Sequence, residues 1–98
     1  MQLKNDQVKP NISTPLLLGL IVADQVYEEE SVDLVITSLN DGVHSETSLH
    51  YSGNGADLRI WNLANPENTV KKIKNRLNKH YDVILEKDHI HLEYQPRG

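Results

Sequence analysis

The sequence contains no cysteine, and this absence excludes several classes of small protein at once. Disulfide scaffolds, thiolate zinc fingers, iron–sulfur clusters and cysteine nucleophiles all need a residue that the chain lacks. A domain of 98 residues without disulfides often needs another stabilising element, such as a bound metal or a partner subunit. The five histidines make a metal the first candidate.

Positive charge is scarce as well. Ten Lys and Arg residues stand against fourteen Asp and Glu residues, which gives a net charge of −4, and the basic residues form no block. Nucleic-acid binding requires clustered positive charge. We therefore expect no nucleic-acid partner.

Long hydrophobic runs are also missing. The longest apolar stretch, residues 15–23, is far shorter than the roughly 20 residues that a membrane span requires. Asp6 lies between Lys4 and Lys9 ahead of it, and no small-x-small cleavage pattern follows, which disfavours a signal peptide. We interpret the stretch as a folded helix and expect a protein made in the cytoplasm, with no membrane span.

The composition is that of one globular domain, with 38% hydrophobic residues, five glycines and four prolines. Residues 1–12 are polar and without periodicity, so we predict a flexible N-terminal arm followed by a single domain over 13–98. Thr14 and Pro15 suggest an N-cap and first helical position. The helix that follows should bury Leu16, Leu17, Leu20 and Ile21 and end at the acidic residues 28–30, which we expect to be solvated.

The rest of the domain alternates strands with one more helix. Short β-branched or alternating segments predict strands over 32–38 and 56–61, and Asn65-Pro66-Glu67 opens a second helix. Two further strands, 81–85 and 89–94, are separated by only three residues, which suggests a hairpin. The order α-β-β-α-β-β predicts a compact α+β domain with a mainly antiparallel sheet of about four strands and two helices.

The last predicted strand has two different faces. Ile90, Leu92 and Tyr94 point to one side, where a core explains them. His89 and His91 point to the other side, and no structural role explains two imidazoles there.

A second polar cluster precedes the 56–61 strand. Asp57 follows His50 by seven positions, a distance of about 23 Å if the chain were extended, so a shared metal would require the chain to double back. Gly53, Asn54 and Gly55 are residue types that permit such a reversal. With one imidazole of the last strand, this gives three ligands and an open fourth position, as in catalytic zinc sites.

These two clusters resemble one known family. The pattern Ser48-x-His50-x-x-Gly53-x-Gly55-x-Asp57, followed by Asp88-His89-Ile90-His91, is similar to the signature of the zinc D-alanyl-D-alanine carboxypeptidase and endolysin peptidase family. That signature reads Ser-x-His-x-x-Gly-x-Ala-x-Asp and then acid-x-x-His near the C-terminus. The resemblance spans residues 48–91 and implies a Hedgehog/DD-peptidase-like fold.

The resemblance also implies roles. His50, Asp57 and His91 would bind Zn²⁺, and Asp88 would act as general base on a metal-activated water. His89 or His44 would stabilise the oxyanion, and Ser48 belongs to the substrate-binding part of the motif.

Two features of the match stay open. Both Glu86-x-x-His89 and Asp88-x-x-His91 fit acid-x-x-His, and we favour the second because the aspartate-type members of the family share the Asp-His-x-His arrangement. The family's upstream arginine is absent, because Asp41 occupies the position after Ser38-Leu39-Asn40. Arg59 or His44 would have to replace it in substrate binding.

The leading hypothesis is therefore a zinc-dependent metallopeptidase that cleaves a peptide bond in peptidoglycan stem peptides, at D-Ala-D-Ala or a similar site. The small size is typical of phage or prophage enzymes that are released to the cell wall. The alternatives are a non-catalytic, metal-stabilised binding domain that keeps the same core and an ordinary metal-free α+β domain.

Overall fold

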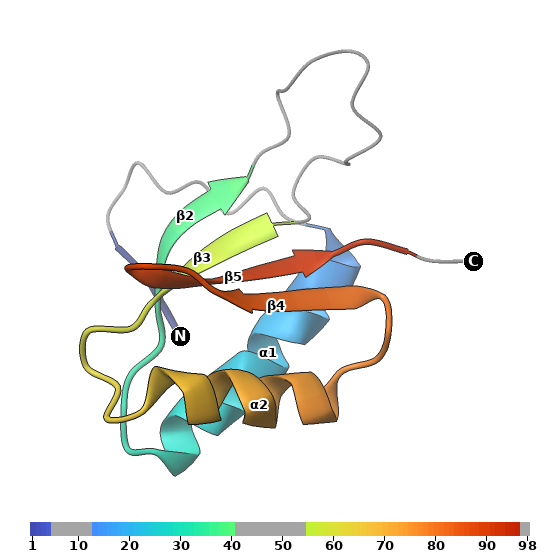
Figure 1. Cartoon of the computed structure of the whole chain (residues 1–98). Helices are drawn as coiled ribbons and strands as arrows, with labels where there is room; N and C mark the ends of the chain where they lie inside the picture. Colours follow the sequence, from blue (N-terminus) through green and yellow to red (C-terminus); the bar gives the residue numbers. More distant parts are fainter. Residues whose placement is uncertain (5–12, 41–54, 97–98) are drawn as a thin grey trace.

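The structure is a computed structural model that describes residues 1–4, 13–40 and 55–96. These residues form, in chain order, β1 (Gln2–Leu3), α1 (Thr14–Glu29), β2 (Val35–Asn40), β3 (Gly55–Arg59), α2 (Pro66–Arg76), β4 (Tyr81–Leu85) and β5 (His89–Tyr94). The strands make one sheet in the order β1-β2-β3-β5-β4. Every neighbouring pair is antiparallel except β1 and β2, which are parallel. Both helices lie against the same side of this sheet (Figure 1), so the fold is a two-layer α+β arrangement.

The predicted α+β class, the two helices and the C-terminal hairpin are confirmed, and the sheet has one strand more than expected. The additional strand, β1, lies in the segment predicted to be an arm. The backbone N–H groups of Gln2 and Lys4 donate to the carbonyls of Leu34 and Ile36, each at 2.8 Å. A strand of two exposed residues has too few positions to produce an alternating pattern, so the sequence gives no sign of it.

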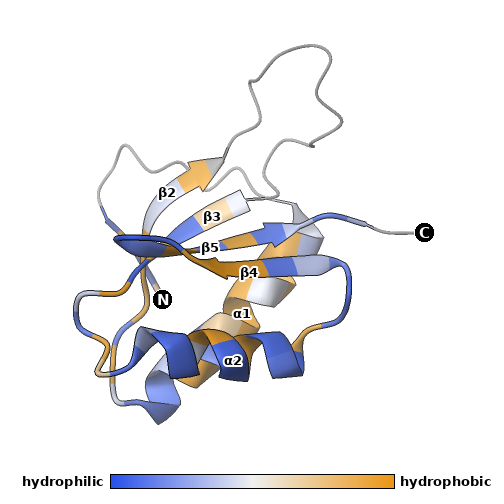
Figure 2. Ribbon diagram, viewed as in Figure 1, coloured by the Kyte–Doolittle hydropathy of each residue, from blue (hydrophilic) through white to orange (hydrophobic). Residues whose placement is uncertain are grey.

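Helix α1 begins one residue earlier than predicted and buries a narrower face. Ser13 is the N-cap, and its hydroxyl accepts a hydrogen bond from the Leu16 N–H at 3.2 Å. The buried residues recur with helical spacing, whereas Leu17 and Ile21, which we expected to be buried, are each 41% exposed. The face against the sheet consists of Leu16, Gly19, Leu20, Ala23, Val26 and Tyr27. In Figure 2 the hydrophobic colour concentrates where α1 and α2 meet the sheet.

Helix α1 approaches β4 closely at Gly19. A Cβ atom added at this glycine would lie 2.8 Å from Cε2 of Tyr81, well inside van der Waals contact. The hydroxyl of Tyr81 donates to the Pro15 carbonyl at 2.7 Å, one turn earlier on the same helix. The absence of a side chain at Gly19 therefore lets Tyr81 of β4 pack against α1 and hydrogen-bond to its first turn.

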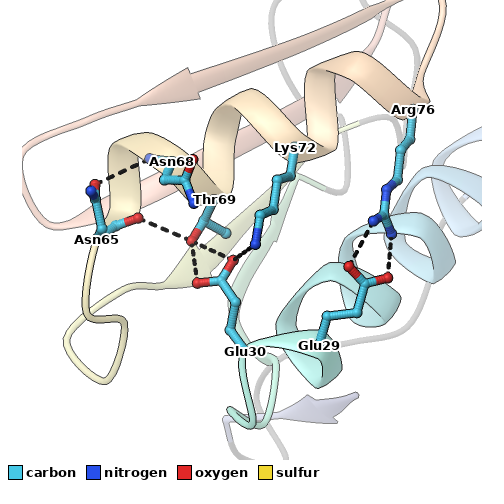
Figure 3. Close-up of polar contacts among 7 residues, drawn as sticks. All are labelled: Glu29, Glu30, Asn65, Asn68, Thr69, Lys72 and Arg76. Atoms are coloured by element: carbon cyan, nitrogen blue, oxygen red, sulfur yellow. Dashed lines mark hydrogen bonds and ion pairs between the residues drawn. The ribbon is translucent and has the colours of Figure 1, made fainter.

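The acidic run at the end of α1 is largely solvated, as expected, since Glu28 and Glu29 are exposed, but Glu29 and Glu30 also join the two helices (Figure 3). Both carboxylate oxygens of Glu29 accept hydrogen bonds from Arg76, at 2.7 and 2.8 Å. Glu30 accepts from the buried Thr69 hydroxyl at 2.9 Å and lies 3.8 Å from the Lys72 ammonium. The partners of this run are on α2, about forty residues away in sequence. Local composition could not identify them.

Tyr27 connects the helical layer to the strand that carries the candidate site. Its side chain is fully buried, and its hydroxyl donates to the carbonyl of Arg59 at 2.8 Å. Burial raises the pKa of Tyr27, and the charge of Glu30 raises it further. The phenol is therefore neutral in the fold at any pH where an exposed tyrosine would still be largely protonated.

We expect the stability of the protein to fall as the pH rises above 10, the ordinary pKa of tyrosine, because the unfolded chain then loses the Tyr27 proton first. Tyr27→Phe should lose about 1–3 kcal/mol at neutral pH, since the Arg59 carbonyl is left without its donor. Between neutral and alkaline pH, the free energy of unfolding should fall less in Tyr27→Phe than in the wild type, because the variant lacks the Tyr27 proton. Urea unfolding of both proteins across this range measures the difference, and parallel pH profiles would contradict it.

Candidate functional site

The sheet face away from the helices carries a row of polar side chains on β3 and β5. Ile90 and Leu92 are fully buried, whereas His89, His91 and Glu93 alternate with them and are partly exposed. The prediction that the last strand has an apolar and a histidine face is confirmed.

The register between β3 and β5 brings the two sequence clusters together. Asp57 of β3 lies opposite His91 of β5, and Arg59 lies opposite His89. Side chains directly opposite each other in an antiparallel pair start from Cβ atoms about 4.5–5.5 Å apart. Residues 34 positions apart in the sequence therefore interact directly.

A bulge in β2 borders this row. The pairing of β2 with β3 shifts between Ile36 and Ser38, so that Thr37 is the additional residue. The Thr37 hydroxyl donates to the Asp57 carbonyl at 3.3 Å. The backbone of Asp57 is thus held from β2 while its side chain interacts with β5.

His91 lies between two carboxylates. Its Nδ1 is 2.9 Å from Oδ1 of Asp57, and its Nε2 is 3.0 Å from Oε1 of Glu93. The hydrogen bond to Asp57 raises the pKa of His91, burial opposes this, and the hydrogen bond to Glu93 adds to the rise, which takes the pKa to about 9. At neutral pH the ring is therefore an imidazolium that donates both of its N–H groups.

His89, two positions before His91 on β5, also lies between two carboxylates. Its Nδ1 is 2.6 Å from Oδ1 of Asp88, and its Nε2 is 3.5 Å from the same Asp57 oxygen that contacts His91. The hydrogen bond with His89 lowers the pKa of Asp88, so this carboxylate is ionised at neutral pH. Asp88 is the outermost member, since its side chain is 85% exposed.

Together these contacts form one continuous line, which we call the carboxylate–imidazole row. It runs in space through Asp88, His89, Asp57, His91 and Glu93. Each imidazole lies between two carboxylates, and Asp57 is shared by both rings. The row places imidazole nitrogens and carboxylate oxygens on a sheet face that neither described helix covers, and such groups bind cations and transfer protons.

An arginine and a tryptophan lie at one end of the row. The guanidinium of Arg59, on the same strand as Asp57, is 4.5 Å from the ring centroid of Trp61. Trp61 is 78% exposed, so it contributes little to the core and offers an aromatic surface beside the row. The position of Arg59 opposite His89 keeps it available as the predicted substrate-binding residue.

The structure brings four of the predicted site residues into one cluster, namely Asp57, Asp88, His89 and His91. His50, the third predicted zinc ligand, lies outside the described residues, as do His44 and Ser48. Among residues 1–4, 13–40 and 55–96, no three side chains are placed together in a way that would hold a metal ion. The predicted set of three ligands includes a residue beyond these ranges, so it stays a prediction.

Glu93 is the member of the row that the sequence analysis missed. It follows His91 by two positions, so the alternation of a strand places both on one face. The signal was therefore present in the His-x-His-x-Glu spacing. It was overlooked because the family motif ends at the histidine.

Comparisons with family models, with curated proteins and with solved structures find no match for this chain. In the part of the chain that the structure describes, neither helix has the length and apolarity needed to cross a membrane.

We expect the metal-free protein to hold a protonated His91 up to about pH 9, because Asp57 and Glu93 both stabilise the charged ring. A raised folded-state pKa adds stability below the ordinary value of 6.5 and loses that contribution as the pH rises to about 9. Asp57→Asn should lower the His91 pKa by removing the charge at Nδ1. A titration of the ring by ¹H–¹⁵N NMR measures both values, and a wild-type pKa near 6.5 would disprove the expectation.

Proposed function

We propose that this protein is a small zinc-dependent peptidase that hydrolyses an amide bond in peptidoglycan-type stem peptides. The observation that carries the proposal is the direct contact of Asp57 with His91 across β3 and β5, at 2.9 Å. These two residues come from separate halves of the family-like motif, and the resemblance assigns a metal-ligand role to each. The α+β fold, with a helix and a hairpin after β3, is compatible with the Hedgehog/DD-peptidase-like fold that the resemblance implies.

The donor chemistry of the two residues fits zinc. A carboxylate and an imidazole are both ligands that Zn²⁺ takes in proteins, and here Oδ1 and Nδ1 converge from adjacent strands. His50 would be the third ligand, as the spacing of the motif implies. A zinc ion with one carboxylate ligand keeps net positive charge, and when bound it acidifies water and polarises a peptide carbonyl.

The other residues of the row would supply acid–base chemistry and binding. Asp88 is ionised at neutral pH, which is the state a general base requires, and its contact with His89 links it to Asp57. His89 would donate a hydrogen bond to the developing oxyanion, as the resemblance implies. Arg59 would bind a substrate carboxylate in place of the family's upstream arginine, while Trp61 beside it offers an apolar surface.

We expect elemental analysis of untagged protein to give about one zinc per chain. His50→Ala and His91→Ala should each abolish stoichiometric binding, since each removes one of three protein ligands. His80→Ala is the matched control. His80 lies outside the carboxylate–imidazole row and its ring contacts Tyr94, so this variant should keep the zinc. A wild-type protein that holds no zinc after dialysis against the metal would overturn the proposal.

Asp88→Asn should keep the zinc and lose turnover by about 100-fold or more, as expected when a general base is removed. The assay is the release of free D-alanine from a stem peptide that ends in D-alanyl-D-alanine. Glu86→Gln is the control, and it should leave the rate nearly unchanged. The opposite result, with loss of turnover only in Glu86→Gln, would assign the base to Glu86 and the ligand role to His89.

A second candidate function is a metal-stabilised binding domain without catalysis. The feature that favours it is the exposed pair of Arg59 and Trp61, because these residue types dominate binding hot spots. Such a domain would show one zinc per chain and no hydrolysis, and Asp88→Asn would leave its affinity for the stem peptide unchanged.

A further inference from the structure

The contact between Glu93 and His91 has no role in the proposed function so far. Oε1 of Glu93 lies 3.0 Å from Nε2 of His91, on the side of the ring away from Asp57. The Glu93 side chain is only 20% exposed, and that of His91 is 26% exposed. This is therefore a partly buried contact between a ring nitrogen and a carboxylate, which is better defined than a contact between fully exposed side chains.

The arrangement of the strands gives Glu93 a direct approach to the ring. His91 and Glu93 alternate on the same face of β5, two positions apart. The residue opposite Glu93 on β3 is Gly55, which brings no side chain to this face. Asp82 lies opposite Glu93 on β4, so two acidic residues occupy directly opposed positions at this point of the sheet. Like charges in that arrangement repel each other, which favours a Glu93 side chain that turns to the Nε2–H of His91.

A histidine that binds a metal through one nitrogen normally donates its other N–H to a carboxylate or carbonyl. That second contact fixes the tautomer and the orientation of the ring and makes the ligating nitrogen more basic. In this protein Asp57, the other proposed ligand on these strands, lies at Nδ1. Nδ1 is then the nitrogen that faces the proposed site, and Nε2 is the nitrogen that Glu93 holds.

We propose that Glu93 is a positioning residue for His91: by accepting the Nε2–H hydrogen bond it orients the ring so that Nδ1 faces the site shared with Asp57. This inference rests on the proposed function, because it gives the ring a metal to face. It adds a residue that lies outside the family-like motif.

The test compares zinc affinities, measured by competition with a chromophoric chelator, in the wild type and in two variants at position 93. Glu93→Gln retains an acceptor oxygen without charge and should bind zinc about 10-fold more weakly than the wild type. Glu93→Ala retains no acceptor and should lose about 100-fold. Asp82→Asn is the matched control. It removes one negative charge opposite Glu93, but it leaves the two contacts of the His91 nitrogens, with Asp57 and Glu93, in place.

A spectroscopic signature separates positioning from a general effect on the fold. In ¹H–¹⁵N correlation spectra of the zinc-loaded wild type, His91 should carry its proton on Nε2, and this proton should exchange faster in Glu93→Ala. Circular dichroism of each variant confirms that it is folded, and Glu93→Gln serves if Glu93→Ala does not fold.

The outcomes distinguish the two proposals. If the wild type binds zinc and Glu93→Gln and Glu93→Ala bind it equally well, Glu93 has no positioning role and the proposed function stands. An equal loss in Asp82→Asn would likewise reduce the effect to bulk charge and overturn the role of Glu93. A wild type that binds no zinc overturns the proposed function and this inference with it.

Discussion

The antiparallel register of β3 and β5 is the constraint on which the candidate site depends. It places Leu58 beside Ile90 in the core and Asp57 beside His91 on the opposite face, in a single alternation. A slip of one residue would exchange the two faces and bury the charged side chains. The burial of Leu58, Ile90 and Leu92 under the helices therefore also fixes the position of the site.

The helices stabilise one face of the sheet, and the candidate site lies on the other face. Helices α1 and α2 cover one side of the sheet and are joined to each other by Glu29, Glu30, Thr69 and Arg76. Tyr27 joins α1 to the sheet, because its hydroxyl donates a hydrogen bond to the Arg59 carbonyl at the end of β3. The carboxylate–imidazole row thus lies on strands whose backbones are anchored from behind. Its side chains lie on the other face of the sheet, where they are partly exposed.

Periodicity predicted much of this arrangement, and non-local contacts account for what it missed. The alternation in β5 indicated both of its faces, and the Asn65-Pro66 pair located the start of α2. The short strand β1 and the partners of Glu30 depend on residues far away in the sequence, which no local pattern encodes. For the site, the motif named Asp57 and His91, which the register brings into contact, and it ended before Glu93, although the alternation of β5 places Glu93 on the same face as His91.

Electrostatics explains why the row contains imidazoles at all. Asp88 precedes β5, Glu93 lies on β5 and Asp57 lies on β3, so three acidic residues follow one another along the row. His89 and His91 occupy the two gaps, and each presents one nitrogen to each flanking carboxylate. The alternation of carboxylates and imidazoles along the row gives every carboxylate a ring nitrogen as its neighbour. The same contacts hold an imidazole and a carboxylate, two groups that a cation such as zinc takes as ligands, next to each other on the face away from the helices.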